Sequence, residues 1–466
     1  LLTENALEVA NQLNLGTADV IKMTEILSSV QQIKEAGVAL PVNEIKDDNL
    51  KLLLNLAQGC EGQASDPDYV ETLKKVLENT VKMDLDRKEQ TVDELFTLTS
   101  SLANKVEEKA QVFNKTGREL AERLNVDQAS SVKLIETLSN LQRIAQADID
   151  VTQNVNDENL TVLLKLAKQC AKKKDDEFVK IVGSTLEDSL TADLYFKLDN
   201  INNLHRLTTE LAVKVTRNTL QVASTAQEVA SSLQLDASQA VKMNDVLLNL
   251  QQLRQMNVPL DVKHIQNEDV KLLVNLALAC DAQSDNPSDF VPTLGRALEK
   301  VIELQPELKS ETINLLRSTA VNLAGKASEI SSSINKTTTK IAETLGIDQP
   351  SAQKIYTILT GLLSIKQANI EIPDEYLKDK NLKILLSACE ELDGDFENTE
   401  LLRLVGDALE NIIKIDLDHK IQNINVLHAS ISDLASYAQS KSSFSQADMA
   451  CQVAKHLQIN ESSAVN

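Results

Sequence analysis

One short apolar segment that carries a single cysteine returns four times along the chain at almost constant spacing. Its cysteines are Cys60, Cys170, Cys280 and Cys389, which lie 110, 110 and 109 residues apart. Each follows a run of Leu, Val, Ile and Ala that is typical of a buried helix. A period of this length predicts a tandem array of similar units, each packed mainly against its neighbours.

A leucine that ends a long amphipathic segment recurs in step with the cysteines. These leucines are Leu13, Leu124, Leu233, Leu345 and Leu457, spaced 111, 109, 112 and 112 residues apart. We therefore divide the chain into repeat units 1–124, 125–233, 234–345 and 346–457, with residues 458–466 beginning a further unit. The chain begins and ends at nearly the same phase, and we expect it to be a segment of a longer array.

The units alternate between two types. Among the odd units, residues 42–45 (VNEI) parallel residues 262–265 (VKHI). Among the even units, residues 147–151 (ADIDV) parallel residues 368–372 (ANIEI). The array is thus of the form A-B-A-B, and duplication of a two-unit block is its simplest origin.

The composition favours an all-α fold. The 466 residues include no Trp, 5 Tyr, 7 Phe, 12 Gly and 8 Pro. Aliphatic residues must therefore form the core, and few residues remain for tight turns. This excludes most all-β folds and the nucleotide-binding folds that depend on glycine-rich loops.

A long helix is predicted at the end of each unit. Within residues 91–124 the apolar positions follow one another at steps of three or four, which is the spacing of one helix face. At ~1.5 Å per residue such a helix is on the order of 50 Å long. It would be shared by neighbouring units and would make a rod or solenoid. Alternatively, Gly117 and residues 331–333 (SSS) could break these helices and leave beads joined by short hinges.

No pattern in the sequence indicates an enzyme, and we expect no catalytic residue and no cofactor. There are only five histidines, and no phosphate-binding glycine loop, zinc-protease motif or nucleophile elbow is present. His205 and His428 occupy equivalent places. We align Phe96 and Leu316 with them, which indicates a partly buried packing position.

The four in-phase cysteines are expected to fill buried positions as small apolar residues, since thiols a whole unit apart are too distant for a disulfide. Cys451 lies off this phase. It is the candidate for an intermolecular thiol.

An acidic group follows the last cysteine-bearing segment. Its densest members, Asp393, Asp395 and Glu397, are weak candidates for binding Ca²⁺, because oxygen ligands clustered in a loop suit that ion. Their spacing does not follow the EF-hand loop, so a solvated turn is the main interpretation. No other metal site is predicted.

Four Asn-x-Ser/Thr sequons make the chain a candidate glycoprotein. They begin at Asn114, Asn159, Asn335 and Asn460. Asn114 and Asn335 share one phase of the odd units, although duplication alone would preserve that relation. Use of these sites would require an extracellular location.

The net charge of −22 restricts the partners. It argues against nucleic acid and against anionic membrane surfaces. No apolar run approaches the length of a membrane span, so no membrane insertion is expected for this segment. The charge should also keep isolated chains apart, so that self-association depends on salt or divalent cations.

The order of elements resembles the helical subdomain of the GAIN domain of adhesion receptors and polycystin-like proteins. The matching segments are residues 245–250 (DVLLNL), 270–279 and 409–413 (LENII). The resemblance implies an extracellular, cell-surface or matrix setting. The chain lacks the His-Leu-Ser/Thr tripeptide of that domain, and the resemblance therefore implies no self-cleavage.

These observations together predict a non-enzymatic structural protein. We expect a tandem helical array that forms or decorates an extracellular filament or surface coat, with self-association as its main protein–protein interaction. The alternative is an intracellular, cytoplasmic scaffold whose helical grooves bind partner proteins.

Overall fold

The computed structural model describes the chain in segments. These are residues 1–40, 42, 45–59, 64, 66–147, 155, 157–192, 195–260, 262, 265–279, 290–304, 306–368, 370–374, 376–390 and 398–441. Within them every regular element is a helix, and no strand occurs. The predicted all-α class is confirmed. The residues form two compact units, Leu1–Leu248 and Asn249–Asn466, and the division into four repeat units remains a prediction.

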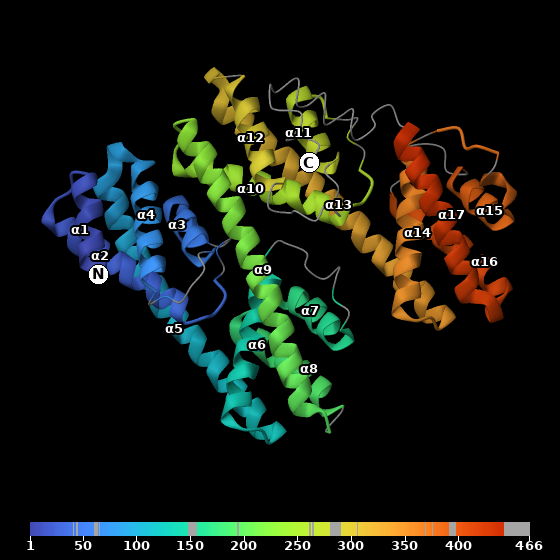
Figure 1. Ribbon diagram of the computed structural model, residues 1–466, viewed down its shortest axis with the longest axis horizontal. Coiled ribbons are helices and arrows are strands. Elements are labelled where there is room, and N and C mark those ends of the chain that lie inside the picture. The colour runs from blue at the N-terminus through green and yellow to red at the C-terminus, as the bar shows by residue number, and fades with distance from the viewer. Residues whose placement is uncertain are drawn as a thin grey trace. The chain divides into compact units, whose positions relative to one another are not determined.

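The first unit consists of long and short helices in alternation (Figure 1). In chain order they are α1 (Leu2–Gln12), α2 (Thr17–Glu35), α3 (Asp48–Gly59), α4 (Pro67–Lys82), η2 (Leu85–Arg87), α5 (Lys88–Leu124), α6 (Gln128–Gln146), α7 (Glu158–Cys170), α8 (Asp175–Thr191), α9 (Lys197–Ser232) and α10 (Ala237–Met256). The boundary between the two units falls inside α10.

The regular elements described in the second unit are also helices. Its helices are α11 (Glu268–Ala279), α12 (Phe290–Glu303), η4 (Pro306–Leu308), α13 (Lys309–Leu345), α14 (Gln349–Ala368), η5 (Tyr376–Lys378), α15 (Lys380–Glu390), α16 (Asn398–Ile415), η6 (Leu417–His419) and α17 (Lys420–Lys441). Within it α14 packs against α15, α16 and α17, and α13 packs against α11, α12, α14 and α16.

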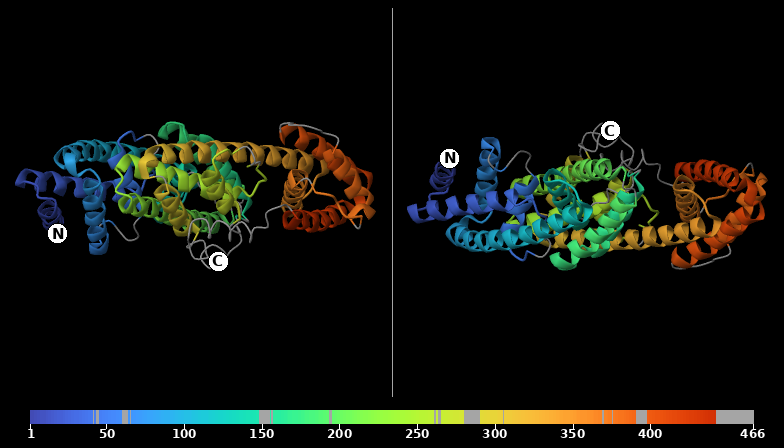
Figure 2. Two further views of the ribbon diagram at one scale, coloured as in Figure 1. Left: turned by 90° about the horizontal axis from the view of Figure 1, so that it is seen from above. Right: turned by 90° about the horizontal axis from the view of Figure 1, so that it is seen from below.

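The long helices are unbroken. α5, α9 and α13 contain 37, 36 and 37 residues, respectively. α5 continues through Gly117, and α13 continues through the serines at 331–333, so neither predicted hinge is present. Figure 2 shows α13 as one continuous ribbon. The predicted continuous helices are therefore observed at both positions where a break was the alternative.

The two halves of α5 contact different groups of helices. Its first half packs on α2, where Asp93 forms an ion pair with Lys22. Its second half packs on α6 and α8, where the rings of Phe113 and Phe178 lie 6.4 Å apart. One helix thus carries part of the core of the helices before it and part of the core of the helices after it.

Glycine allows close approach between helices at several of these contacts. A Cβ atom on Gly117 would lie 2.2 Å from Cγ1 and 3.3 Å from Cα of Ile135 in α6. In the second unit, a Cβ on Gly361 of α14 would lie 2.6 Å from Cγ2 of Ile431 in α17. Gly117 therefore acts as a packing position inside α5, where the sequence alone suggested a possible break.

Replacing Gly117 by Ala should destabilise the protein although Ala is the better helix former. We expect a loss of about 1–3 kcal/mol in unfolding free energy, because the new methyl group overlaps the α6 side chain and backbone. Gly325→Ala is the matched control in α13, since nothing lies within 4 Å of a Cβ there. It should gain about 0.5–1 kcal/mol from helix propensity alone. Urea unfolding of both variants measures the difference, and equal shifts would contradict the packing role.

A lysine at the first position of a long helix binds the carbonyl end of the preceding long segment. Lys88 Nζ lies 2.5 Å from the Leu13 carbonyl oxygen and 3.4 Å from that of Asn14. Lys197 Nζ donates to the Leu124 carbonyl in the same way. In the second unit, Lys420 Nζ lies 2.7 Å from the Leu345 oxygen and 3.0 Å from that of Gly346. A cation at these unpaired carbonyls offsets the negative end of the helix dipole.

Substitution of Lys88 by Met should loosen this link without disturbing helix propensity. We expect a loss of about 1–2 kcal/mol, the usual size for a charge-assisted hydrogen bond at a helix C-terminus. Lys105→Met is the control, because Lys105 is exposed on the same helix and has no polar partner in the described part of the chain. The thermal and urea unfolding midpoints report the effect. If both variants had the same unfolding midpoints, the contacts of Lys88 with the carbonyl oxygens would contribute nothing to stability.

The residue after each long segment adopts the left-handed conformation. Asn14, Asn125, Gln234 and Gly346 have φ values of 52°, 49°, 55° and 56°. Each directly follows one of the repeat leucines. This backbone turn ends a helix and redirects the chain, so the four positions share one backbone geometry as well as one place in the sequence pattern.

Helix starts are capped at recurring positions. Asp127, Asp236 and Asp348 are N-caps, since each accepts a hydrogen bond from a backbone N–H three residues on, at 2.8, 2.8 and 3.0 Å. Hydrogen bonds from the Ser130 side chain and backbone hold the pKa of Asp127 below its usual value. The cysteine-bearing helices are capped in the same way by Asp47, Asp157, Asn267 and Asp379.

Candidate functional site: a basic cleft in the first unit

The residues singled out from the sequence do not gather into one site. Asn114, Asn159 and Asn335 have exposed side chains on α5, α7 and α13. Asn460, Cys451 and the calcium candidates Asp393, Asp395 and Glu397 lie outside the described residues. In the described ranges, no group of three or more His, Cys, Asp or Glu side chains is placed to hold a metal ion.

The in-phase cysteines are packing residues where the structure describes them. Cys170 and Cys389 are free thiols with 3% and 4% of their surface exposed. Cys60 and Cys280 lie outside the described residues. Burial of the first two confirms the prediction for the even units.

The histidine comparison needs a change of register. Eight residues after the first residue of each long helix stand Phe96, His205, Arg317 and His428, so Leu316 is one residue out of line. Of these, Phe96, His205 and His428 are half-buried, as expected for a packing position. His205 Nε2 lies 2.5 Å from Glu136 Oε2 on α6, and burial lowers the pKa of His428.

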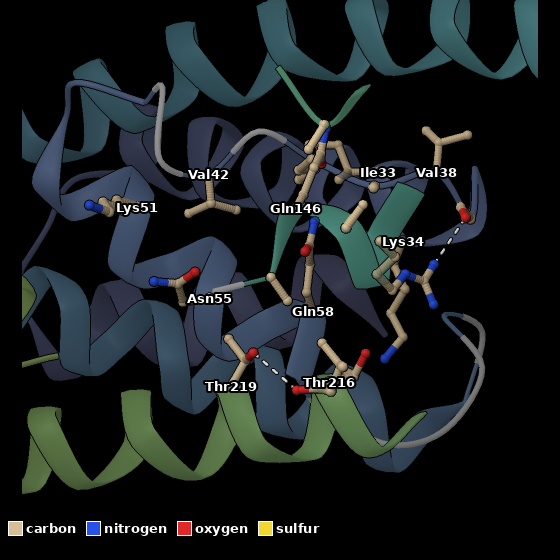
Figure 3. Close-up of a pocket in the computed structure, with 18 of the residues that line it drawn as sticks. Ile33, Lys34, Val38, Val42, Lys51, Asn55, Gln58, Gln146, Thr216 and Thr219 are labelled. Atoms are coloured by element: carbon tan, nitrogen blue, oxygen red, sulfur yellow. Dashed lines mark hydrogen bonds between the residues drawn. The ribbon is translucent and has the colours of Figure 1, made fainter. Parts of the chain in front are cut away.

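A cleft of about 490 Å³ lies entirely within the first unit. Its walls come from the end of α2 and the segment after it, and from α3, α6, the turn after α7, α9 and α10. Lys51, Asn55 and Gln58 face it because residues four and three apart share one side of α3 (Figure 3). The volume is in the usual range for small-molecule sites.

Four cations line the cleft, namely Lys34, Lys51, Arg143 and Lys172. No Asp or Glu is found among the described residues that line it. This concentration of positive charge is unexpected in a chain with a net charge of −22. The lining therefore attracts negatively charged groups, although the protein as a whole has a negative net charge.

Arg143 is held by the backbone and has no carboxylate partner among the described residues. Its Nη2 atom donates to the Gly37 carbonyl oxygen at 2.9 Å, and Ser139 Oγ donates to the same oxygen at 2.5 Å. Burial lowers the pKa of the Arg143 guanidinium. A partly desolvated cation without a counter-charge is costly, and this cost would be relieved by an anion in the cleft.

Lys34 lies near the end of α2 and is positioned by an aromatic ring. Its Nζ atom lies 4.1 Å from the centre of the Tyr69 ring, where the negative face of the ring attracts the ammonium group. The same arrangement occurs in the second unit, where the guanidinium carbon of Arg254 lies 4.3 Å from the centre of the Phe290 ring. The position of this cation is thus fixed by an aromatic neighbour.

Two amide oxygens in the lining have no hydrogen-bond donor among the residues that the structure describes. They are Gln146 Oε1 on α6 and Asn244 Oδ1 on α10, both buried. Only 4% of the Asn244 surface is exposed. By contrast, Thr219 Oγ1 is satisfied by the Val215 carbonyl oxygen at 3.0 Å (Figure 3). Buried acceptors without donors are rare in folded proteins, and these two mark where a polar ligand could bind.

The rest of the lining is apolar. Ile33, Val38, Leu40, Val215 and Leu248 line the same cleft. The site therefore combines cations, unsatisfied amides and an aliphatic wall. This arrangement can bind a molecule that has both a charged end and an apolar part.

Sequence reasoning missed this cleft because its charged residues come from separate helices. Lys34 and Arg143 are more than one hundred residues apart, and no local motif links them. One signal was available in the sequence. When Ala147 is aligned with Ala368, Arg143 corresponds to Ser364 and Ala145 corresponds to Lys366, so the cation occupies a different position in the two segments.

A second cavity, of about 420 Å³, lies on the other side of Arg143. It shares Gly37, Val38 and Arg143 with the cleft, and Asn114 and His205 also line it. Unlike the cleft, it contains carboxylates, those of Glu35 and Glu136. Arg143 and the Gly37 carbonyl oxygen thus lie at the wall common to two spaces of different charge.

Comparison with known proteins gives no match: no family model, no curated protein and no solved structure is significantly similar to the chain.

The wall at Gly37 depends on an unusual backbone angle. Gly37 has a φ of +66°, and Asn257, 220 residues later, has a φ of +45°. Gly37→Ala should cost about 1–2 kcal/mol, because a residue with Cβ disfavours the left-handed region. Gly37→Asn is the matched variant and should lose clearly less, since Asn tolerates this conformation. Urea unfolding of both variants measures the difference in unfolding free energy. A larger loss for Gly37→Asn than for Gly37→Ala would contradict the role of the backbone angle.

Proposed function

We propose that the chain is a non-enzymatic structural protein, an A-B-A-B array of four helical units. Shared long helices would join the units into a rod or solenoid that forms or decorates an extracellular filament or surface coat. The carrying observation is the recurrence of one set of contacts at the repeat spacing. Lys88, Lys197 and Lys420 each bind the carbonyl end of the preceding long segment.

Further recurrences support the array. Every proposed unit has a left-handed residue directly after a repeat leucine. Every proposed unit also has an N-cap at the helix that precedes its in-phase cysteine or contains it. Close contacts repeat as well: Gly183 lies beside Thr116, and Gly406 lies beside Thr337. Units built on the same contacts can add to one another in series, and they expose similar faces at a fixed interval.

None of the helices in the described part of the chain combines the length and apolarity that a membrane crossing requires. The proposed coat or filament would therefore be held together by protein–protein contacts of this segment. Its net charge of −22 opposes such contacts until the charge is screened or bridged.

Self-association should consequently depend on ionic conditions. Screening extends over about 30 Å at 0.01 M ionic strength and about 8 Å at 0.15 M. We expect sedimentation velocity to show separate chains at low salt and larger species at physiological salt or with divalent cations. Matching the ionic strength of NaCl and MgCl₂ separates general screening from bridging by the divalent ion. Association that changes with neither ionic strength nor added chelator would contradict the proposal.

An intracellular scaffold is the second candidate, and one observation favours it. Cys170 and Cys389 are free, buried thiols, as expected for a reducing compartment. Glycopeptide mass spectrometry of native material distinguishes the two settings. Glycans at both Asn114 and Asn335 would place the array outside the cell. Both sites bare, with the in-phase cysteines reduced, would favour the scaffold.

A further inference from the structure

We propose that the cleft of the first unit binds a small amphiphilic organic acid. The ligand would place its carboxylate at the cationic side of the cleft, its apolar body on the aliphatic wall and a hydrogen-bond donor at the unsatisfied amides. This binding activity is independent of the proposed array function.

The charge of the ligand follows from Arg143. This guanidinium is partly desolvated, is fixed through the Gly37 carbonyl oxygen, and has no carboxylate partner among the described residues. Lys51 on α3 and Lys172 after α7 add two further cations from other walls. An arginine can bind a carboxylate through two parallel hydrogen bonds, which gives orientation as well as attraction.

The apolar body follows from the aliphatic wall. Val38, Leu40 and Val215 are at least nine-tenths buried and also line the cleft. An inorganic anion would leave this wall uncovered. A short alkyl chain would cover it and gain the free energy of removing apolar surface from water.

The hydrogen-bond donor follows from two buried acceptors. Asn244 Oδ1 and Gln146 Oε1 lack any donor in the described part of the chain. Asn244 and Leu248 lie four residues apart on α10, so an unsatisfied amide and an apolar side chain share one face. A ligand hydroxyl could donate to either amide while its carbon chain lies on the apolar residues.

The second block of the repeat supplies the best test variant. Ser364 occupies the position that corresponds to Arg143, so the fold accommodates serine there. Ser139 Oγ would still satisfy the Gly37 carbonyl oxygen after Arg143→Ser. The variant should therefore fold and lose mainly the cation.

Isothermal titration calorimetry on the full chain tests the proposal with octanoate, 3-hydroxyoctanoate, 1-octanol, octylammonium and inorganic phosphate. We expect octanoate to bind with a stoichiometry of one, and 3-hydroxyoctanoate to bind at least as tightly. Arg143→Ser should weaken octanoate binding about tenfold, the usual effect of losing one charge-assisted contact. Raising the salt concentration should weaken it further.

Lys105→Ser is the matched control, because it removes one positive charge from an exposed position of α5 outside the cleft. It should leave octanoate affinity unchanged. If Arg143→Ser fails to fold by circular dichroism, Lys51→Ser decides, with an expected loss of about threefold or more from the weaker, partly exposed cation.

Four results would overturn the proposal. Octanol or octylammonium binding as tightly as octanoate would remove the role of the cations. Phosphate binding as tightly as octanoate would remove the role of the apolar wall. The ligand would lie elsewhere if octanoate bound equally tightly to the folded Arg143→Ser variant, to Lys105→Ser and to the unaltered chain. The amides would have no role if 3-hydroxyoctanoate bound more weakly than octanoate.

Discussion

The long helices depend on what happens at their ends. A helix of 37 residues leaves unpaired carbonyls at its C-terminus. In this chain the first lysine of the next long helix supplies the missing donors. The contact joins segments more than seventy residues apart and closes a group of helices around one core.

The elements could be predicted from sequence because they rest on local signals. Apolar residues that follow one another every three or four positions predicted the continuous α5. Asp127 and Asp348 lie at the starts of the helices that follow them. The role of Gly117 could not be predicted in this way. Low helix propensity suggested a break there, whereas the structure uses the missing side chain for contact with Ile135. A tertiary contact of this kind outweighs a propensity of about 1 kcal/mol.

The cleft shows the other limit of sequence reasoning. Its cations and amides come from five segments, and no local pattern in the sequence links them. What makes them a site is that α2, α3, α6, α9 and α10 meet around one space. The charge of this space depends on single residues such as Arg143, which the periodicity of the helices does not specify.

A repeated scaffold can carry a site that is not itself repeated. The backbone contacts at Lys88 and Lys420 are alike in the two units, and each block also carries a cation against an aromatic ring. The two blocks differ where Arg143 is aligned with Ser364. Residues that hold helices together are constrained by every neighbouring contact. Residues that face an open cleft are constrained less by packing, so two similar segments can carry their cation at different positions without loss of the fold. The position of Arg143 is therefore a feature that the packing of helices alone would not require.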